Sequence, residues 1–133
     1  MKEKILFVNS CVRGENESRT LALAKTALSR LDGDIEEIRL ADADLKPLDA
    51  AGLAKRAESA EKNDFSDPVY DCAKQFAACD TVVIAAPFWD YSFPSFLKIY
   101  IESLCVGGLT FLYGSDGVPI SYCRAKRLIY ITT

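Results

Sequence analysis

The sequence of 133 residues contains no histidine. A chain without histidine cannot use Ser-His-Asp or Cys-His catalysis, imidazole ligation of a metal, or an imidazole proton shuttle. The sequence also has no apolar run of about 18 residues, which predicts that no helix crosses a membrane and that the protein has no membrane partner. These absences remove whole classes of active site before any motif is considered.

Cysteine is present, but without the spacing that a metal or redox site needs. The five cysteines are odd in number, and no two are at C-x-x-C spacing; they are Cys11, Cys72, Cys79, Cys105 and Cys123. The start of the chain, with charged residues directly before an apolar run, predicts no signal peptide and a cytoplasmic location. We therefore expect reduced cysteines that act as small core residues, and no metal site. A catalytic Cys11 at the end of the first strand is the alternative.

The overall composition is that of a folded domain. Half of the residues are hydrophobic and 26% are charged, which excludes intrinsic disorder. The length predicts one domain over residues 1–133. The net charge of −3 argues against nucleic acid as a partner.

Apolar runs alternate with helical patterns along the chain. Continuous apolar runs, typical of parallel strands buried on both faces, stand out at residues 5–8, 81–87 and 128–131, and residues 35–40 resemble an edge strand. Helical patterns follow at residues 21–31, 49–62, 68–79 and 94–105. Ser18 or Asn16 is the candidate cap for the first of these helices, and Ser92 for the last. Residues 110–122 resemble a hairpin. This order predicts an α/β protein with a doubly wound parallel sheet.

The loop after the first strand offers groups that bind phosphate. Residues 9–20 lack both the dinucleotide-binding and the P-loop pattern. They do carry donors directly before a helix N-terminus, chiefly Ser10, Asn16, Ser18 and Arg19. Backbone N–H groups, hydroxyls and the helix dipole can converge there on a phosphate dianion. An ordinary capped loop between strand and helix is the alternative.

The loop after the strand predicted at residues 81–87 is unusually aromatic. It contains Pro87, Phe88, Trp89, Asp90 and Tyr91. An aromatic wall at a strand end can stack on a flat heterocycle, although a hydrophobic plug or a subunit contact would use the same residues. Because ligands of open parallel sheets bind outside the carboxyl ends of the strands, the two loops together predict a mononucleotide such as FMN.

Several segments carry a resemblance to a known family. They are residues 4–10 (KILFVNS) with 18–20 (SRT), residues 83–94 (VIAAPFWDYSFP), and residues 108–113 (GLTFLY) before Gly117. The whole chain resembles the flavodoxin-like NAD(P)H-dependent FMN oxidoreductases, which include FMN-dependent azoreductases and quinone reductases. The resemblance implies FMN at the carboxyl ends of the strands, NADH or NADPH as co-substrate, and a homodimer. Electrons would pass from the nicotinamide through the flavin to a quinone, azo or nitro acceptor.

The resemblance also implies roles for individual residues. Ser10, Asn16, Ser18 and Arg19 would hold the phosphate or ribityl chain of FMN. The isoalloxazine ring would be lined by Pro87, Phe88, Trp89, Asp90 and Tyr91. Tyr113 would border the pocket of the small-molecule electron acceptor. No side chain needs to act as a catalytic acid or base, because the cofactor carries the chemistry.

The sequence departs from the family at its end. Members of the family continue with a Gly-rich loop, a fifth strand and further helices, whereas this chain stops at Thr133. We therefore expect strand order 2-1-3-4 with the fifth strand and last helices absent, an exposed edge at residues 128–131, and impaired activity. Two other functions are compatible with the fold. One is a flavodoxin-type electron carrier, which the long first loop with Arg13 and Arg19 disfavours. The other is a non-enzymatic association domain.

Overall fold

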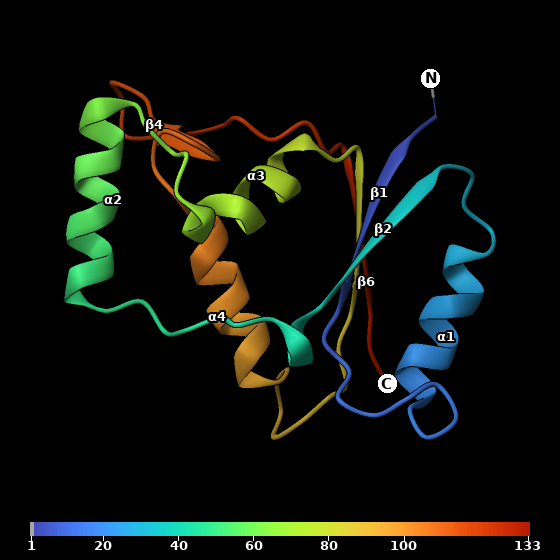
Figure 1. Cartoon of the computed structure of the whole chain (residues 1–133). Coiled ribbons are helices and arrows are strands. Elements are labelled where there is room, and N and C mark those ends of the chain that lie inside the picture. The colour runs from blue at the N-terminus through green and yellow to red at the C-terminus, as the bar shows by residue number, and fades with distance from the viewer. Residues whose placement is uncertain (1) are drawn as a thin grey trace.

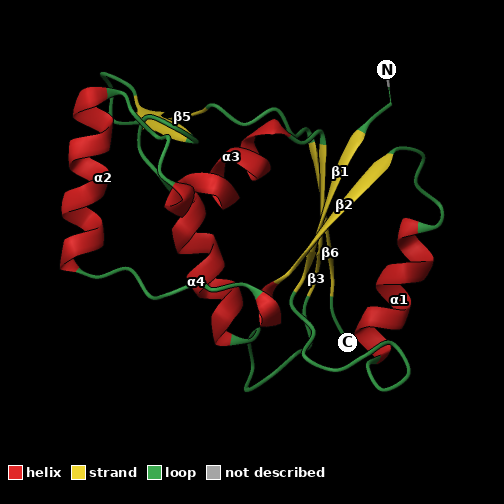
Figure 2. Cartoon of the chain, in the orientation of Figure 1, coloured by secondary structure: helices red, strands yellow, loops and turns green. Residues whose placement is uncertain are grey.

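The computed structural model describes residues 2–133, and its centre is a four-stranded parallel sheet (Figures 1 and 2). The strands are β1 (Lys4–Asn9), β2 (Asp34–Arg39), β3 (Thr81–Ala85) and β6 (Arg127–Ile131), in the order β2-β1-β3-β6. All three pairings are parallel. The predicted α/β class and the predicted order of the four strands are confirmed.

Helices cover both faces of this sheet (Figure 1). α1 (Arg19–Leu28) packs on one face, and α3 (Asp71–Ala78) and α4 (Ser95–Leu104) pack on the other. Successive side chains of a strand point to opposite faces, so the core divides into two layers. The α1 layer contains Ile5, Phe7, Val83, Ala85, Leu21, Ala24 and Leu28. The α3–α4 layer contains Leu6, Val8, Val82, Ile84, Leu97, Tyr100 and Leu104.

The helix starts show where the sequence prediction was right and where it was wrong. The Ser18 hydroxyl accepts a hydrogen bond from the backbone N–H of Leu21 at 3.1 Å and caps α1, as a serine at this position favours. The helix predicted from residue 68 begins as a 3-10 turn, Pro68–Tyr70. The cap predicted at Ser92 is wrong, because α4 begins after Pro94 and no side chain caps it.

α2 (Ala50–Lys62) forms an outer layer beyond α4 (Figure 1). None of its residues is buried, and Leu53 on its apolar side is 56% exposed. Polar contacts attach it to the body: the Arg56 guanidinium donates to the carbonyl oxygens of Glu102 at 2.7 Å and Cys105 at 3.1 Å. These carbonyls lie at the C-terminal end of α4, where a cation is favoured. The apolar side of α2 therefore does not pack on the rest of the chain.

The predicted hairpin is present as β4 (Phe111–Tyr113) and β5 (Pro119–Ser121), which pair antiparallel. It lies beside the end of α2, at the end of the molecule where the sheet strands begin (Figures 1 and 2). Its apolar side chains stay exposed; they are Leu112, Tyr113, Val118, Ile120 and Tyr122. Like α2, the hairpin presents apolar surface that no other part of the described chain covers.

Candidate functional site

The two loops that the sequence singled out lie at the same edge of the sheet, after β1 and after β3 (Figure 1). Hydrogen bonds join them. The backbone N–H of Ser10 donates to the carbonyl oxygen of Ala85 at 2.8 Å. Thr133 contacts both sides, because its hydroxyl lies 2.6 Å from that of Thr20 and its carbonyl accepts from the N–H of Phe88 at 3.2 Å. The fold thus brings together segments about 70 residues apart in sequence.

Ser10 and Ser18 are buried in the first loop. Gly14 turns the loop back, since its carbonyl accepts from the N–H groups of Glu17 at 3.0 Å and Ser18 at 2.9 Å. Ser10 has no exposed surface, and its hydroxyl has no hydrogen-bond partner within residues 2–133. A buried hydroxyl without a partner costs free energy. A donor of this kind, in the loop that leads from β1 to the N-terminus of α1, is suited to an anion bound by that loop.

The other two residues predicted for the first loop, Asn16 and Arg19, are exposed. Arg19 is the first residue of α1 and follows the Ser18 cap directly. Their side chains are free to turn toward a ligand at the mouth of the loop, whereas the two serines lie beneath it. Three of the four residues therefore lie on the loop and Arg19 begins the helix; the two serines are buried, whereas Asn16 and Arg19 are exposed.

A polar network at the end of β1, which the sequence analysis missed, fixes where the first loop begins. The buried Asn9 side chain accepts from the N–H of Cys11 at 3.0 Å and donates to the Glu37 carboxylate at 3.2 Å. Lys25 donates to the other oxygen of Glu37 at 3.1 Å. Burial works to raise the pKa of Glu37, but the hydrogen bonds from Asn9 and Lys25 outweigh it, so the pKa lies below its usual value. Glu37 is therefore ionised at neutral pH.

Cys11, the alternative catalytic residue, lies buried at the start of the loop. Burial raises the pKa of its thiol, and a hydrogen bond from Ser18 and the charge of Arg39 offset this only in part. A thiol with a raised pKa is a poor nucleophile. Cys11 thus acts as a small buried residue, and Cys79 is buried as well. The expectation of core cysteines is wrong for Cys105, which is exposed, and only partly met by Cys72 and Cys123, which are half-buried.

The aromatic loop forms a tight two-residue turn. Trp89 and Ser92 exchange two backbone hydrogen bonds, of 2.9 and 2.8 Å, around Asp90 and Tyr91. Asp90 has φ 49° and Tyr91 has φ 63°, in the left-handed region. Such turns favour Asn-Gly, and a bulky residue there is strained. Strain of this kind is typical of functional sites, where the surrounding structure maintains it.

The aromatic side chains of this turn face solvent. Phe88, Trp89 and Tyr91 are exposed, and Tyr91 is 94% exposed. The rings of Phe88 and Tyr91 meet edge to face, with centroids 6.2 Å apart. Pro87 is half-buried at the base of the loop. An exposed aromatic wall on a strained turn is available to stack on a flat ring rather than to fill the core.

Tyr113 does not join this group within one chain. It lies on β4, at the opposite end of the molecule from the two loops (Figure 1). The hairpin is connected to the start of β6, whereas the loops follow the ends of β1 and β3. A single copy of the chain therefore places nine of the predicted site residues at one edge of the sheet and Tyr113 elsewhere.

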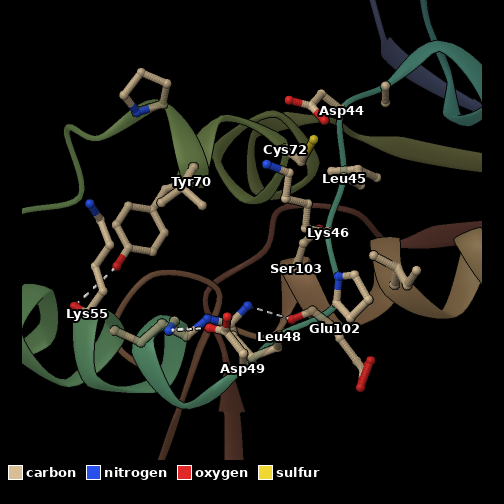
Figure 3. Close-up of a pocket in the computed structure, with 17 residues that line it drawn as sticks. Asp44, Leu45, Lys46, Leu48, Asp49, Lys55, Tyr70, Cys72, Glu102 and Ser103 are labelled. Carbon is tan, nitrogen blue, oxygen red and sulfur yellow. Dashed lines mark hydrogen bonds between the residues drawn. The ribbon is translucent and has the colours of Figure 1, made fainter.

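A pocket of about 470 Å³ opens between α2, α3 and α4 (Figure 3), and no residue of the loops after β1 and β3 lines it. Several of its polar groups are engaged in holding α2. Asp49 accepts from the N–H of Gly52 at 2.8 Å as the helix cap, and the Tyr70 hydroxyl donates to Ser59 at 2.8 Å. Arg56 is used at the end of α4. The polar groups Asp49, Tyr70 and Arg56 of this pocket thus serve to hold α2 in place. The loops after β1 and β3 remain the candidate site.

Two further classes of site find no support in residues 2–133. No group of three or more Cys, Asp or Glu side chains is arranged to hold a metal ion within these residues. Within the same part of the chain, no helix has the length and apolar character needed to cross a membrane.

A parallel sheet in this order, with helices on both faces, a loop rich in donors after β1 and an aromatic loop after β3, defines a flavodoxin-like protein. A family profile described as a flavodoxin-like fold matches residues 3–133. The FMN-dependent NADH:quinone oxidoreductase of Clostridium perfringens is 30% identical over 98% of this chain and 68% of the relative. The protein of the same name from Stenotrophomonas maltophilia is 34% identical over 95% of this chain and 64% of the relative. The chain therefore belongs to the flavodoxin-like family that contains these FMN-dependent oxidoreductases.

A solved structure extends the likeness in fold. An FMN-dependent NADH-azoreductase from Bacillus anthracis, solved in complex with FMN, aligns with a TM-score of 0.68 at 20% identity, over 96% of this chain and 68% of that one. This chain spans about two thirds of the length of these relatives. The fold predicted by the resemblance is thus shown.

Proposed function

We propose that this chain is an FMN-dependent oxidoreductase that takes electrons from NADH and passes them to a quinone, with azo compounds as further acceptors. The redox chemistry, which is to accept hydride from NADH and to pass on its electrons, would be supplied by bound FMN. The names of the relatives support the donor, cofactor and acceptor. The observation that carries the proposal is the Ser10 hydroxyl, buried without a partner in the loop before α1, where a phosphate group would give it one.

The residues at the sheet edge fit FMN in two parts. Ser10, Ser18, Asn16 and Arg19 would bind the phosphate and ribityl chain. The strained turn with Phe88, Trp89, Asp90 and Tyr91, based on Pro87, would hold the isoalloxazine ring. Because the turn conformation is set before the ligand arrives, little ordering is needed on binding. The single domain would thus orient the ring, while the nicotinamide and the acceptor reach it from solvent.

The first prediction tests the cofactor. Titration of FMN into the purified chain should quench flavin fluorescence with a micromolar or lower Kd, because a dianion gains hydrogen bonds at the first loop. Riboflavin, which lacks the phosphate, should bind at least about thirtyfold more weakly, since hydrogen bonds to a charged group are worth about 2 kcal/mol. NADH oxidation by the FMN-loaded protein, with and without a quinone, would then test the reaction.

The outcomes separate the proposed function from the two alternatives. FMN binding without NADH oxidation would favour a flavodoxin-type electron carrier. Absence of FMN binding by a folded chain would favour an association domain and contradict the proposal. Equal binding of riboflavin and FMN would contradict the phosphate role of the first loop.

We also propose a homodimer, with the outer face of α2 and the hairpin as its interface. Leu53 of α2 and the exposed apolar residues of the hairpin are not covered by any described part of the chain. The two elements lie beside each other (Figures 1 and 2), and Gly108, just before the hairpin, faces Ala60 of α2. Continuous exposed apolar surface marks a protein contact. Tyr113 lies on the hairpin and would therefore be part of this interface, away from the two loops of its own chain.

The second prediction tests this interface. Replacing both Leu53 and Ile120 with glutamate should weaken self-association at least about tenfold, since two charges would be buried in an apolar contact. Leu23 on α1, which is 49% exposed on the other side of the sheet, provides the control as Leu23→Glu. Sedimentation velocity measures the association. A wild-type monomer, or equal weakening by the control, would contradict the proposed interface.

The cytoplasmic location is proposed on the cysteines. All five are free in the structure. Free thiols persist in a reducing compartment, whereas small secreted domains pair theirs.

A further inference from the structure

β2 presents two charged side chains beside the first loop. In the register of the sheet, Phe7 lies opposite Glu37 and Asn9 lies opposite Arg39. Residues 37 and 39 are two apart, so they point to the same face of the strand, which is the α1 face. Glu37 bonds to Asn9 and Lys25, as described above. The edge strand of the sheet therefore contacts the phosphate loop from the side.

Arg39 makes the second of these contacts. Its guanidinium donates to the backbone carbonyl of Val12 at 3.4 Å, and its Nε pairs with the Asp42 carboxylate at 3.0 Å. The bond to Val12 is long for a hydrogen bond, so its effect is mainly one of position and charge. The carbonyl of Val12 is turned toward Arg39, so the contact joins β2 to the middle of the first loop.

The charge of Arg39 reaches the base of the loop. Its field lowers the pKa of Cys11, although burial keeps that pKa above its ordinary value. The same charge that favours a thiolate at Cys11 favours a phosphate dianion bound by the neighbouring Ser10. A guanidinium has five donor groups, and Asp42 and Val12 do not use them all. Two carboxylates compete for this charge: Asp42, which is largely exposed, and Glu37, whose pKa the charge of Arg39 also lowers.

We propose that Arg39 is a positioning residue for the phosphate of FMN: it holds the first loop at Val12 and places a fixed positive charge behind it. The inference rests on the proposed function, and it gives β2 a second role at the first loop, beside that of Glu37, which bonds to Asn9. The residue acts through the loop and need not touch the reacting ring. Its effect should therefore appear in the preference for FMN over riboflavin and not in the binding of the ring.

Three variants and a control test this role. Arg39→Gln should weaken FMN binding about fivefold and leave riboflavin binding unchanged, because only the phosphate responds to the charge. Arg39→Lys, which keeps the charge, should recover most of the loss. Asp42→Asn, which frees Arg39 of its partner, should strengthen FMN binding about twofold, the size expected of an exposed ion pair. Arg30→Gln removes a charge from the exposed end of α1 and should change neither affinity.

The readout is the ratio of the riboflavin Kd to the FMN Kd, with a circular dichroism melt to show that each variant folds. Equal weakening of FMN and riboflavin by Arg39→Gln would reduce Arg39 to a purely structural residue and overturn the inference, as would no change in either. If Arg39→Gln does not fold, the exposed Asp42→Asn variant still decides, since weaker or unchanged FMN binding would contradict the role. A wild-type chain without preference for FMN would instead contradict the proposed function.

Discussion

Replacing Ser10 with alanine should stabilise the chain without ligand and weaken FMN binding. The hydroxyl is buried and has no partner within residues 2–133, so its removal should raise the free energy of unfolding by about 1 kcal/mol. The same change removes a donor to the phosphate, and FMN binding should weaken about thirtyfold. The opposite signs are the signature of a group that is kept for a ligand.

A thermal melt of the ligand-free protein and a fluorescence titration with FMN measure the two effects. Ser115→Ala serves as the control, because Ser115 is exposed in the turn between β4 and β5, away from the two loops. It should change neither quantity. A Ser10→Ala variant that is less stable than the wild type and binds FMN equally well would show that the hydroxyl has a structural partner and no role in the site.

Replacing Tyr91 with glycine should likewise separate stability from binding. Tyr91 has φ 63°, where a bulky side chain is strained by about 1–3 kcal/mol and glycine is not. Part of this gain is lost because glycine is more flexible in the unfolded chain, so the free energy of unfolding should rise by about 1 kcal/mol. Loss of an aromatic ring from the ligand wall should weaken FMN binding about tenfold.

Tyr91→Phe is the matched control, since it keeps both the ring and the left-handed backbone. It should leave stability and FMN affinity close to those of the wild type. Riboflavin binding should weaken as much as FMN binding in Tyr91→Gly, because the ring is common to both ligands. If Tyr91→Gly binds both flavins as well as the wild type does, the aromatic turn does not hold the ring. It would then serve as a subunit contact, which is one of the alternatives given by the sequence.

The repeating pattern of the sequence was sufficient for the sheet. The apolar runs that become β1 and β3 are long, uninterrupted and bounded by turn residues, so their burial in the centre of the sheet was predictable. The Ser18 cap was equally local, because it depends on a hydroxyl three residues before the N–H that it accepts from. Ser92 shows the limit of such reasoning. It is also a serine shortly before a helix, but its backbone is paired with that of Trp89 in a tight turn, and it does not cap α4.

The orientation of α2 was not predictable from its pattern. Leu53, Ala57 and Ala60 give the helix an apolar side, which normally turns to the core. In the structure the polar contacts of Arg56 and Ser59 decide the orientation, and Leu53 remains exposed. Their partners are carbonyls at the end of α4 and the hydroxyl of Tyr70, which no pattern within α2 reveals.

The sequence by itself determined the class of fold and the two loops that carry the candidate site, because burial of apolar runs and helix capping depend on residues that are near each other in the chain. Only the tertiary structure decided which distant groups meet. Asn9 with Glu37, Val12 with Arg39, and Thr133 with both Thr20 and Phe88 are joined across the sheet. The tertiary structure also places Tyr113, on β4, at the other end of the molecule from the loops after β1 and β3. These relations follow from strand order and register, which bring together residues that are remote in sequence.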